Sequence, residues 1–109
     1  MTKYKILLAE DAKIDIQETR RYILEKFHYR EYAENYSESI RKAIESLEFF
    51  AEAHKVTGIT IDGYPIYCYP RSTYLIFYII ENHGLMVIRV LKNRMAWQRI
   101  IKHIKTIKI

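Results

Sequence analysis

The chain has 109 residues, half of them hydrophobic, which supports one core, so we expect a single domain spanning residues 1–109. Its net charge of +5 is uneven, because residues 1–54 carry nine Lys and Arg against eleven Asp and Glu, whereas residues 55–109 carry nine against two. One cysteine, Cys68, excludes an internal disulfide, and no run approaches the ~20 apolar residues of a membrane helix. These features favour a cytoplasmic protein without membrane contact.

The N-terminal half is predicted to form a short strand and two helices. Residues 3–8 alternate like a strand, and Asp11 is the expected N-cap of a helix that ends near Phe27. After a tight connection at 28–30, a second helix extends to about His54. The first apolar stripe comprises Ile16, Tyr22, Ile23, Leu24 and Phe27, and the second comprises Tyr36, Ile40, Ala43, Ile44, Leu47, Phe50 and Ala51. Such a helical hairpin has one face available to cover a sheet.

The middle of the chain is predicted to be less regular. Gly58 and Gly63 mark turns around a possible short strand at 59–61. The segment 64–70 has a proline near each end, Pro65 and Pro70, and neither has an N–H group for a sheet ladder. We therefore expect this strand to be short or to lie at a sheet edge.

Two apolar runs, Tyr74–Ile80 and Leu85–Leu91, are separated by four residues and predict an antiparallel hairpin. The first run is nearly free of polar residues, so it should be a central strand covered by helices on at least one side. Arg89 is the one charge in the second run, on the face expected for Val87 and Leu91, where it must reach solvent, a partner or an anion.

The C-terminal segment is predicted to be a basic amphipathic helix, for which Asn93 is the expected cap. Its apolar side comprises Trp97, Ile100, Ile101, Ile104 and Ile107, and its polar side comprises Arg99, Lys102, His103 and Lys105. The expected fold class is therefore α+β, with an N-terminal helical hairpin packed on a small, mostly antiparallel sheet and a short C-terminal helix.

Basic and aromatic residues gather around the predicted strand hairpin and form the candidate site. The residues are Arg71, Arg89, Lys92, Arg94, Tyr74, Tyr78 and Trp97. Guanidinium groups and aromatic rings suit phosphates and bases of single-stranded RNA, and they equally suit a protein interface. The sequence shows no metal-ligand spacing, glycine-rich phosphate loop or placed general base, so we expect no metal and no cofactor, and catalytic residues stay unknown.

The segment YLIFYIIENHGLMVIRVLKNRMAW, residues 74–97, resembles the C-terminal hairpin of the RelE/ParE superfamily of toxins from type II toxin–antitoxin modules. It is most similar to the ParE branch, although Tyr67 stands where ParE-like chains often carry arginine. The resemblance implies two N-terminal helices packed on an antiparallel sheet. It also implies a cognate antitoxin, which the basic half of the chain suggests is acidic.

Members of this superfamily differ in target, since RelE-like members cut mRNA in the ribosomal A site and ParE-like members inhibit DNA gyrase. RelE-like cleavage uses basic side chains on the central strand and on the strand before it, positions at or close to Ile66, Cys68 and Leu75 in this chain. We therefore expect a ParE-like toxin that inhibits DNA gyrase by protein binding. The alternatives are a RelE-like endoribonuclease whose partners are the ribosome and mRNA, and a toxin fold that has lost its activity.

Overall fold

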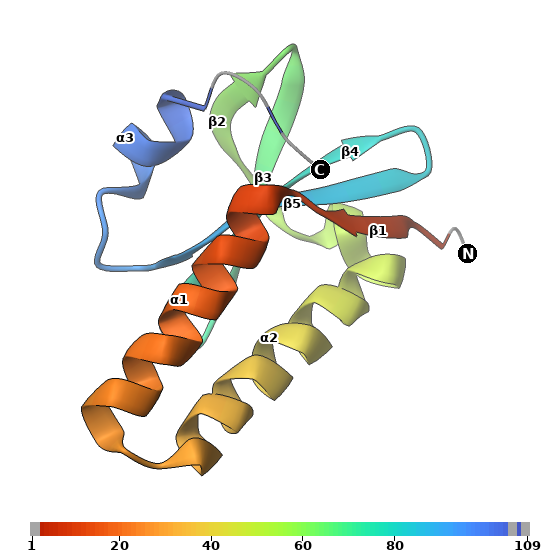
Figure 1. The fold of residues 1–109 in the computed structure, drawn as a ribbon. Helices are drawn as coiled ribbons and strands as arrows, with labels where there is room; N and C mark the ends of the chain where they lie inside the picture. Colours follow the sequence, from red (N-terminus) through yellow and green to blue (C-terminus); the bar gives the residue numbers. More distant parts are fainter. Residues whose placement is uncertain (1–2, 105–106, 108–109) are drawn as a thin grey trace.

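In the computed structural model, which describes residues 3–104 and residue 107, a helical hairpin covers one face of a twisted sheet (Figure 1). The described strands follow the order β1-β5-β4-β3-β2, with β1 parallel to β5 and the other neighbours antiparallel. The elements are β1 (Lys5–Leu8), α1 (Glu10–Phe27), α2 (Arg30–Phe50), β2 (Lys55–Ile61), β3 (Tyr64–Arg71), β4 (Tyr74–Glu81), β5 (Gly84–Lys92) and α3 (Trp97–Lys102). This arrangement confirms the expected α+β fold class.

Strand β4 lies in the middle of the sheet, between β5 and β3, as its apolar sequence predicted. Its side chains alternate between the two faces. Ile76 and Tyr78 pack against the helical hairpin, whereas Phe77 and Ile79 pack in a second cluster with Ile101 of α3. Both faces of the central strand are therefore covered.

The two long helices have different ends from those the sequence predicted. Ala9, not Asp11, is the N-cap of α1, and the Ala9 carbonyl accepts a hydrogen bond from the Lys13 amide at 3.2 Å. Asp11 lies instead in the first turn, where its negative charge faces the positive end of the helix. Helix α2 ends at Phe50, before the expected His54, because the chain tightens into a 3₁₀ turn at Ala51–Ala53.

The connected ends of α1 and α2 project past the sheet (Figure 1). His28 adopts a left-handed conformation with φ of 60° and ends α1, so the connection to α2 is short. Tyr22 and Phe27 were expected in the apolar stripe that faces the core, but both side chains are exposed. The prediction was wrong for these two residues because the strands of the described part of the chain end before the last turns of α1 (Figure 1).

Strand β3 is an interior strand, which corrects the expectation of a short or edge strand. Its prolines lie near its ends, and each is paired on one side only, Pro65 with Thr60 of β2 and Pro70 with Leu75 of β4. A missing N–H group near an end of the strand disturbs the ladders less than one in its middle would, so an interior strand can contain both prolines. The less regular segment before it forms β2, an edge strand whose register shifts between Val56 and Thr60.

A β-bulge changes the alternation of β5. The register with β4 shifts at Phe77 and Tyr78, so that Arg89 pairs with Phe77 while Val87 pairs with Tyr78. Val87 packs against the helical hairpin and Leu91 packs in the opposite cluster. The expectation that Val87 shares a face with Arg89 and Leu91 was therefore wrong, because the bulge adds one residue between Val87 and Arg89, whereas Arg89 and Leu91 keep the two-residue alternation.

The C-terminal helix α3 begins at Trp97, with Ala96 as its N-cap, so the expected cap at Asn93 is wrong. The Asn93 amide instead donates to the Thr73 carbonyl at 2.9 Å, which ties the chain after β5 to the β3–β4 turn. Trp97, Ile104 and Ile107 pack on the second cluster as predicted, while Lys105 lies outside the described residues. Among the described residues, none of the helices is long and apolar enough to cross a bilayer.

Candidate interaction site

A groove of about 430 Å³ opens between the projecting end of the helical hairpin and the neighbouring strand ends, and we call it the tip groove. Its lining residues are Tyr22, Ile23, Phe27, Tyr32, Thr73, Tyr74, Lys92, Asn93 and Arg94. The lining holds aromatic rings and two cations but no acidic side chain. Three residues of the predicted site, Tyr74, Lys92 and Arg94, therefore come together here.

Tyr22 is held between two lysines at one wall of the tip groove. The Lys92 ammonium lies 4.1 Å from the centre of the Tyr22 ring, and the Lys26 ammonium donates a hydrogen bond of 3.0 Å to the Tyr22 hydroxyl. This hydrogen bond from Lys26 lowers the pKa of the Tyr22 phenol below its ordinary value. The cation–π contact therefore holds the Lys92 charge in the groove, and the hydrogen bond holds the Lys26 charge beside the Tyr22 hydroxyl.

The strand ends place further site residues in one row. In the sheet register Arg71 is opposite Tyr74, and Tyr74 is opposite Lys92. The ring of Tyr74 packs against Tyr36 of α2, with 4.8 Å between ring centres, so its orientation is set by the helical hairpin. Arg71 is exposed at the end of β3 and does not line the groove.

Arg89 has an internal partner. Its Nε and Nη2 atoms donate to the two carboxylate oxygens of Asp15 on α1, at 2.7 and 2.8 Å, and the Val90 amide donates to the same carboxylate at 2.9 Å. The Arg89 and Asp15 side chains are only 22% and 10% exposed. This bidentate contact joins α1 to β5, and the Asp15 carboxylate raises the pKa of Arg89.

Tyr78 and Trp97 contribute to the scaffold. Tyr78 is fully buried, and its hydroxyl donates to the Ala51 carbonyl at 2.6 Å. Trp97 packs on Phe77, with 5.3 Å between ring centres, on the sheet face opposite the long helices. Neither residue lines the tip groove, so the structure divides the predicted cluster into surface residues and packing residues.

The strand positions that carry cations in RelE-like enzymes have apolar surroundings here. Ile66 is fully buried, and Leu75 packs in the cluster formed with α3. Cys68 is half-buried, and burial raises the pKa of its thiol, which keeps it protonated. Within residues 3–104 and 107, no three His, Cys, Asp or Glu side chains lie close enough together to bind a metal ion.

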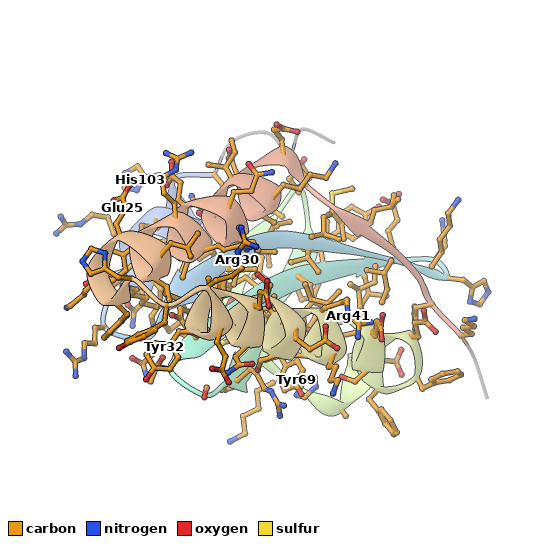
Figure 2. The ribbon with its side chains drawn as sticks, turned by 60° about the horizontal axis from the view of Figure 1, so that its bottom comes forward. Glu25, Arg30, Tyr32, Arg41, Tyr69 and His103 are labelled. Carbon is orange, nitrogen blue, oxygen red and sulfur yellow. The ribbon has the colours of Figure 1, made fainter. Side chains whose placement is uncertain are left out.

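Sequence reasoning missed the aromatic residues of the hairpin end. Phe27 and Tyr32 contact edge to face with ring centres 5.7 Å apart, and Tyr29 contacts Tyr32 in the same way at 5.5 Å. Figure 2 shows Tyr32 at the end of the molecule away from the β4–β5 turn. The high density of aromatic residues between Tyr22 and Tyr32 could have indicated an interaction surface. A helical stripe predicts burial, however, unless one knows that the sheet ends before the last turns of the helix.

Comparisons with known proteins agree with this architecture. A family model described as the ParE toxin of the type II toxin–antitoxin system parDE matches residues 6–97. A solved structure described as the chromosomal ParDE toxin–antitoxin system from P. aeruginosa is similar in fold, with a TM-score of 0.66 and 11% sequence identity, covering 83% of this chain and 96% of that chain. A search of curated protein sequences found no significant match.

Proposed function

Because this chain belongs to the ParE toxin family of type II toxin–antitoxin systems, we propose that it inhibits DNA gyrase by binding it and that a cognate antitoxin neutralises it. The observation that carries this proposal is the family match, which extends over residues 6–97 and therefore over the long helices and all of the sheet except its first residue. Gyrase is the target that the ParE-like resemblance implies.

The surroundings of Ile66, Cys68 and Leu75 favour an inhibitor over an endoribonuclease. Phosphodiester cleavage needs a proton acceptor near the 2′-hydroxyl and a cation near the charge that develops on phosphorus. The three side chains at these positions supply neither group. Removing even one group of this kind from an enzyme costs roughly 10²–10³ in rate, so mRNA cleavage is not expected.

We also propose that the surface part of the predicted site contacts the target. This part consists of the exposed Arg71 and Arg94 and the half-buried Tyr74 and Lys92, at adjoining strand ends and just after β5. Arg89 and Tyr78, which are engaged with Asp15 and Ala51, would act through the scaffold instead. An interface of this kind uses tyrosine and arginine as its main anchors.

Two parallel assays test the target. Purified chain is incubated with gyrase and relaxed plasmid, and separately with ribosomes programmed with mRNA. We expect loss of supercoiling, weakened about tenfold by Arg94→Ala, and intact mRNA. Cleavage of A-site mRNA with undisturbed supercoiling would replace this proposal with the RelE-like alternative.

The antitoxin is tested by co-expression with the adjacent reading frame. We expect co-purification with a short acidic protein, tighter binding at low salt than at high salt, and a gain of helix or strand signal in the partner by circular dichroism. Binding that ignores salt and leaves the partner unordered would count against an acidic antitoxin.

A further inference from the structure

Cations of the C-terminal half gather at one end of the sheet. In the sheet register Arg71 of β3 and Lys92 of β5 pair with the same residue of the central strand, and Arg94 follows two residues later. The two acidic residues of this half, Asp62 and Glu81, lie in or beside the turns at the other end of the same strands. The length of β4 separates the two ends by about 23 Å, at the usual rise per residue. We call Arg71, Lys92 and Arg94 the basic end of the sheet.

The three cations of the basic end are not used inside the fold. Arg71 and Arg94 are exposed, and Lys92 is half-buried. The salt bridges within the described residues involve other cations. Glu18 of α1 lines the neighbouring pocket with Lys92, yet no ion pair joins the two within the described part of the chain. Cations that gather without internal partners raise the local potential and attract a polyanion.

The spacing of these cations fits a groove of duplex DNA. Residues directly opposite each other in neighbouring strands point to the same face, so Arg71 and Lys92 share the face on which Tyr74 packs against α2. Their strands are two apart in the sheet, which places their Cα atoms roughly 10 Å from each other. The major groove of B-DNA is about 12 Å wide. Long cationic side chains at this separation therefore reach phosphates on both sides of one groove.

The aromatic rings at the basic end favour a duplex over a single strand. Single strands bind proteins by stacking their bases on free aromatic faces. Here the Lys92 ammonium covers one face of Tyr22, 4.1 Å from the ring centre. Tyr74 packs on Tyr36, with 4.8 Å between ring centres. A duplex keeps its bases stacked inside and needs only contacts to its phosphates, which the basic end offers.

We propose that the basic end of the sheet binds the phosphate backbone of duplex DNA while the chain is bound to gyrase. The inference deepens the proposed function and rests on it for the target, since gyrase itself holds a DNA duplex. Contacts to both partners keep the chain on the enzyme–DNA complex more tightly than on the enzyme alone. Phosphate contacts carry no sequence information, so the surface suits any DNA on which gyrase acts.

The first experiment measures binding of the purified chain to a short labelled DNA duplex by fluorescence anisotropy, without gyrase, from about 50 to 200 mM salt. The variants are Arg71→Ala, Lys92→Met and Arg94→Ala. The matched control is Lys42→Ala, which removes an exposed cation from α2. Melting temperatures establish that every variant is folded.

Three phosphate contacts predict that the logarithm of the binding constant falls with the logarithm of the salt concentration with a slope of about −2.7. Each variant of the basic end should make this slope shallower by about 0.9, and Lys42→Ala should leave it unchanged. A duplex that does not bind, a slope that the three variants leave unchanged, or an equal loss in the control would overturn the inference. Tighter binding of poly-glutamate or of single-stranded RNA than of the duplex would also overturn it.

A second experiment separates this inference from the proposed function by measuring affinity for gyrase with and without linear DNA. We expect DNA to raise the affinity of the original chain at least ~10-fold and the variants of the basic end to lose this gain. Inhibition of gyrase without any gain from DNA would overturn the inference and leave the proposed function standing. Binding of the duplex through the basic end by a chain that does not inhibit gyrase would reject the proposed function and support the DNA contact.

Discussion

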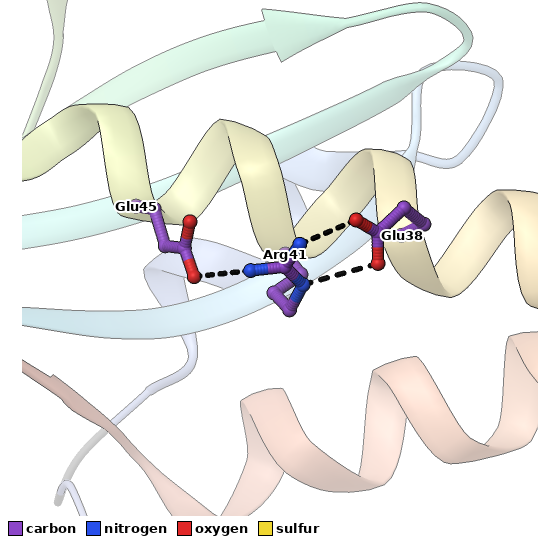
Figure 3. A network of polar contacts seen from close by, with 3 residues as sticks. All are labelled: Glu38, Arg41 and Glu45. Carbon is purple, nitrogen blue, oxygen red and sulfur yellow. Dashed lines mark hydrogen bonds and ion pairs between the residues drawn. The ribbon is translucent and has the colours of Figure 1, made fainter.

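The interface between the helical hairpin and the sheet differs from the outer face of α2 in how polar groups are used. At the interface, Arg89 and Asp15 make a shielded bidentate contact between residues 74 positions apart in the sequence. On the outer face, Arg41 bridges Glu38 and Glu45 of its own helix (Figure 3), and its side chain is 53% exposed. An arginine–carboxylate pair therefore joins two elements, α1 and β5, at the interface, whereas on the outer face it links residues within one helix.

The contribution of these polar contacts to stability depends on how well they are shielded from solvent. Removing one partner of a shielded pair leaves the other charge without solvent or ligand, which is costly. An exposed pair is screened by water, and its loss returns each group to solvent. The burial of a polar network therefore predicts its contribution to stability better than its number of hydrogen bonds does.

The largest expected effect is that of Asp15→Ala, which leaves Arg89 and the Val90 amide without their acceptor. We expect the free energy of unfolding to fall by about 3 kcal/mol, measured by urea denaturation. Asp15→Asn, which keeps an acceptor for Val90 but loses the charge, should have an intermediate effect. A change no larger than that of Glu38→Ala would show that the two regions do not differ.

A second test compares two buried tyrosines at the same interface. Tyr78→Phe removes the hydrogen bond to the Ala51 carbonyl and should lower the free energy of unfolding by about 1–2 kcal/mol. Tyr36 is also buried, and burial raises its pKa to about 12. Its hydroxyl lies near the Thr19 side chain but makes no hydrogen bond of good geometry among the described residues. Tyr36→Phe should therefore be neutral or slightly stabilising. Equal losses in both variants would contradict this distinction.

The outer face of α2 should be much less sensitive. Arg41→Ala removes the contacts with Glu38 and Glu45, yet we expect only a small loss of stability, far below that of Asp15→Ala, because such pairs are exposed to solvent. Addition of 1 M salt should reduce even this difference, since exposed pairs are screened. Thermal unfolding with and without salt measures it, and a loss comparable to that of Asp15→Ala would refute the comparison.

The smallest expected effect concerns pH and His54, whose ring stacks on Tyr69 with 3.9 Å between ring centres. Burial lowers the pKa of His54 below its ordinary value, so the unfolded chain binds the proton more tightly than the folded chain. Stability from this group is therefore lost as the pH falls through the ordinary histidine pKa of about 6.5 and is regained as the pH rises.

Melting temperatures between pH 5.5 and pH 7.5 measure this dependence. His54→Gln should flatten it, whereas His83→Gln, at an exposed position in the β4–β5 turn, should leave it unchanged. An NMR titration that gives His54 a pKa above that of a free histidine would reverse the expected sign.

The sequence alone determined the elements whose residues repeat with a clear period. The stripe from Tyr36 to Leu47 predicted α2, and the apolar run at 74–80 predicted a central strand. Both predictions were possible because the spacing of apolar residues indicates whether an element is buried on one side or on both. The resemblance of residues 74–97 also identified the ParE-like family that the match over residues 6–97 shows.

The tertiary structure decided which of these side chains are covered and by what. Spacing cannot tell that the sheet ends before the last turns of α1, so Tyr22 and Phe27 were assigned to the core although they line a groove. It also cannot place Asp15 beside Arg89, because that contact depends on the packing of α1 on β5 and on a bulge that shifts the register by one residue. Local periodicity reports where a chain is apolar, but only the assembled elements define where that apolar surface stays open.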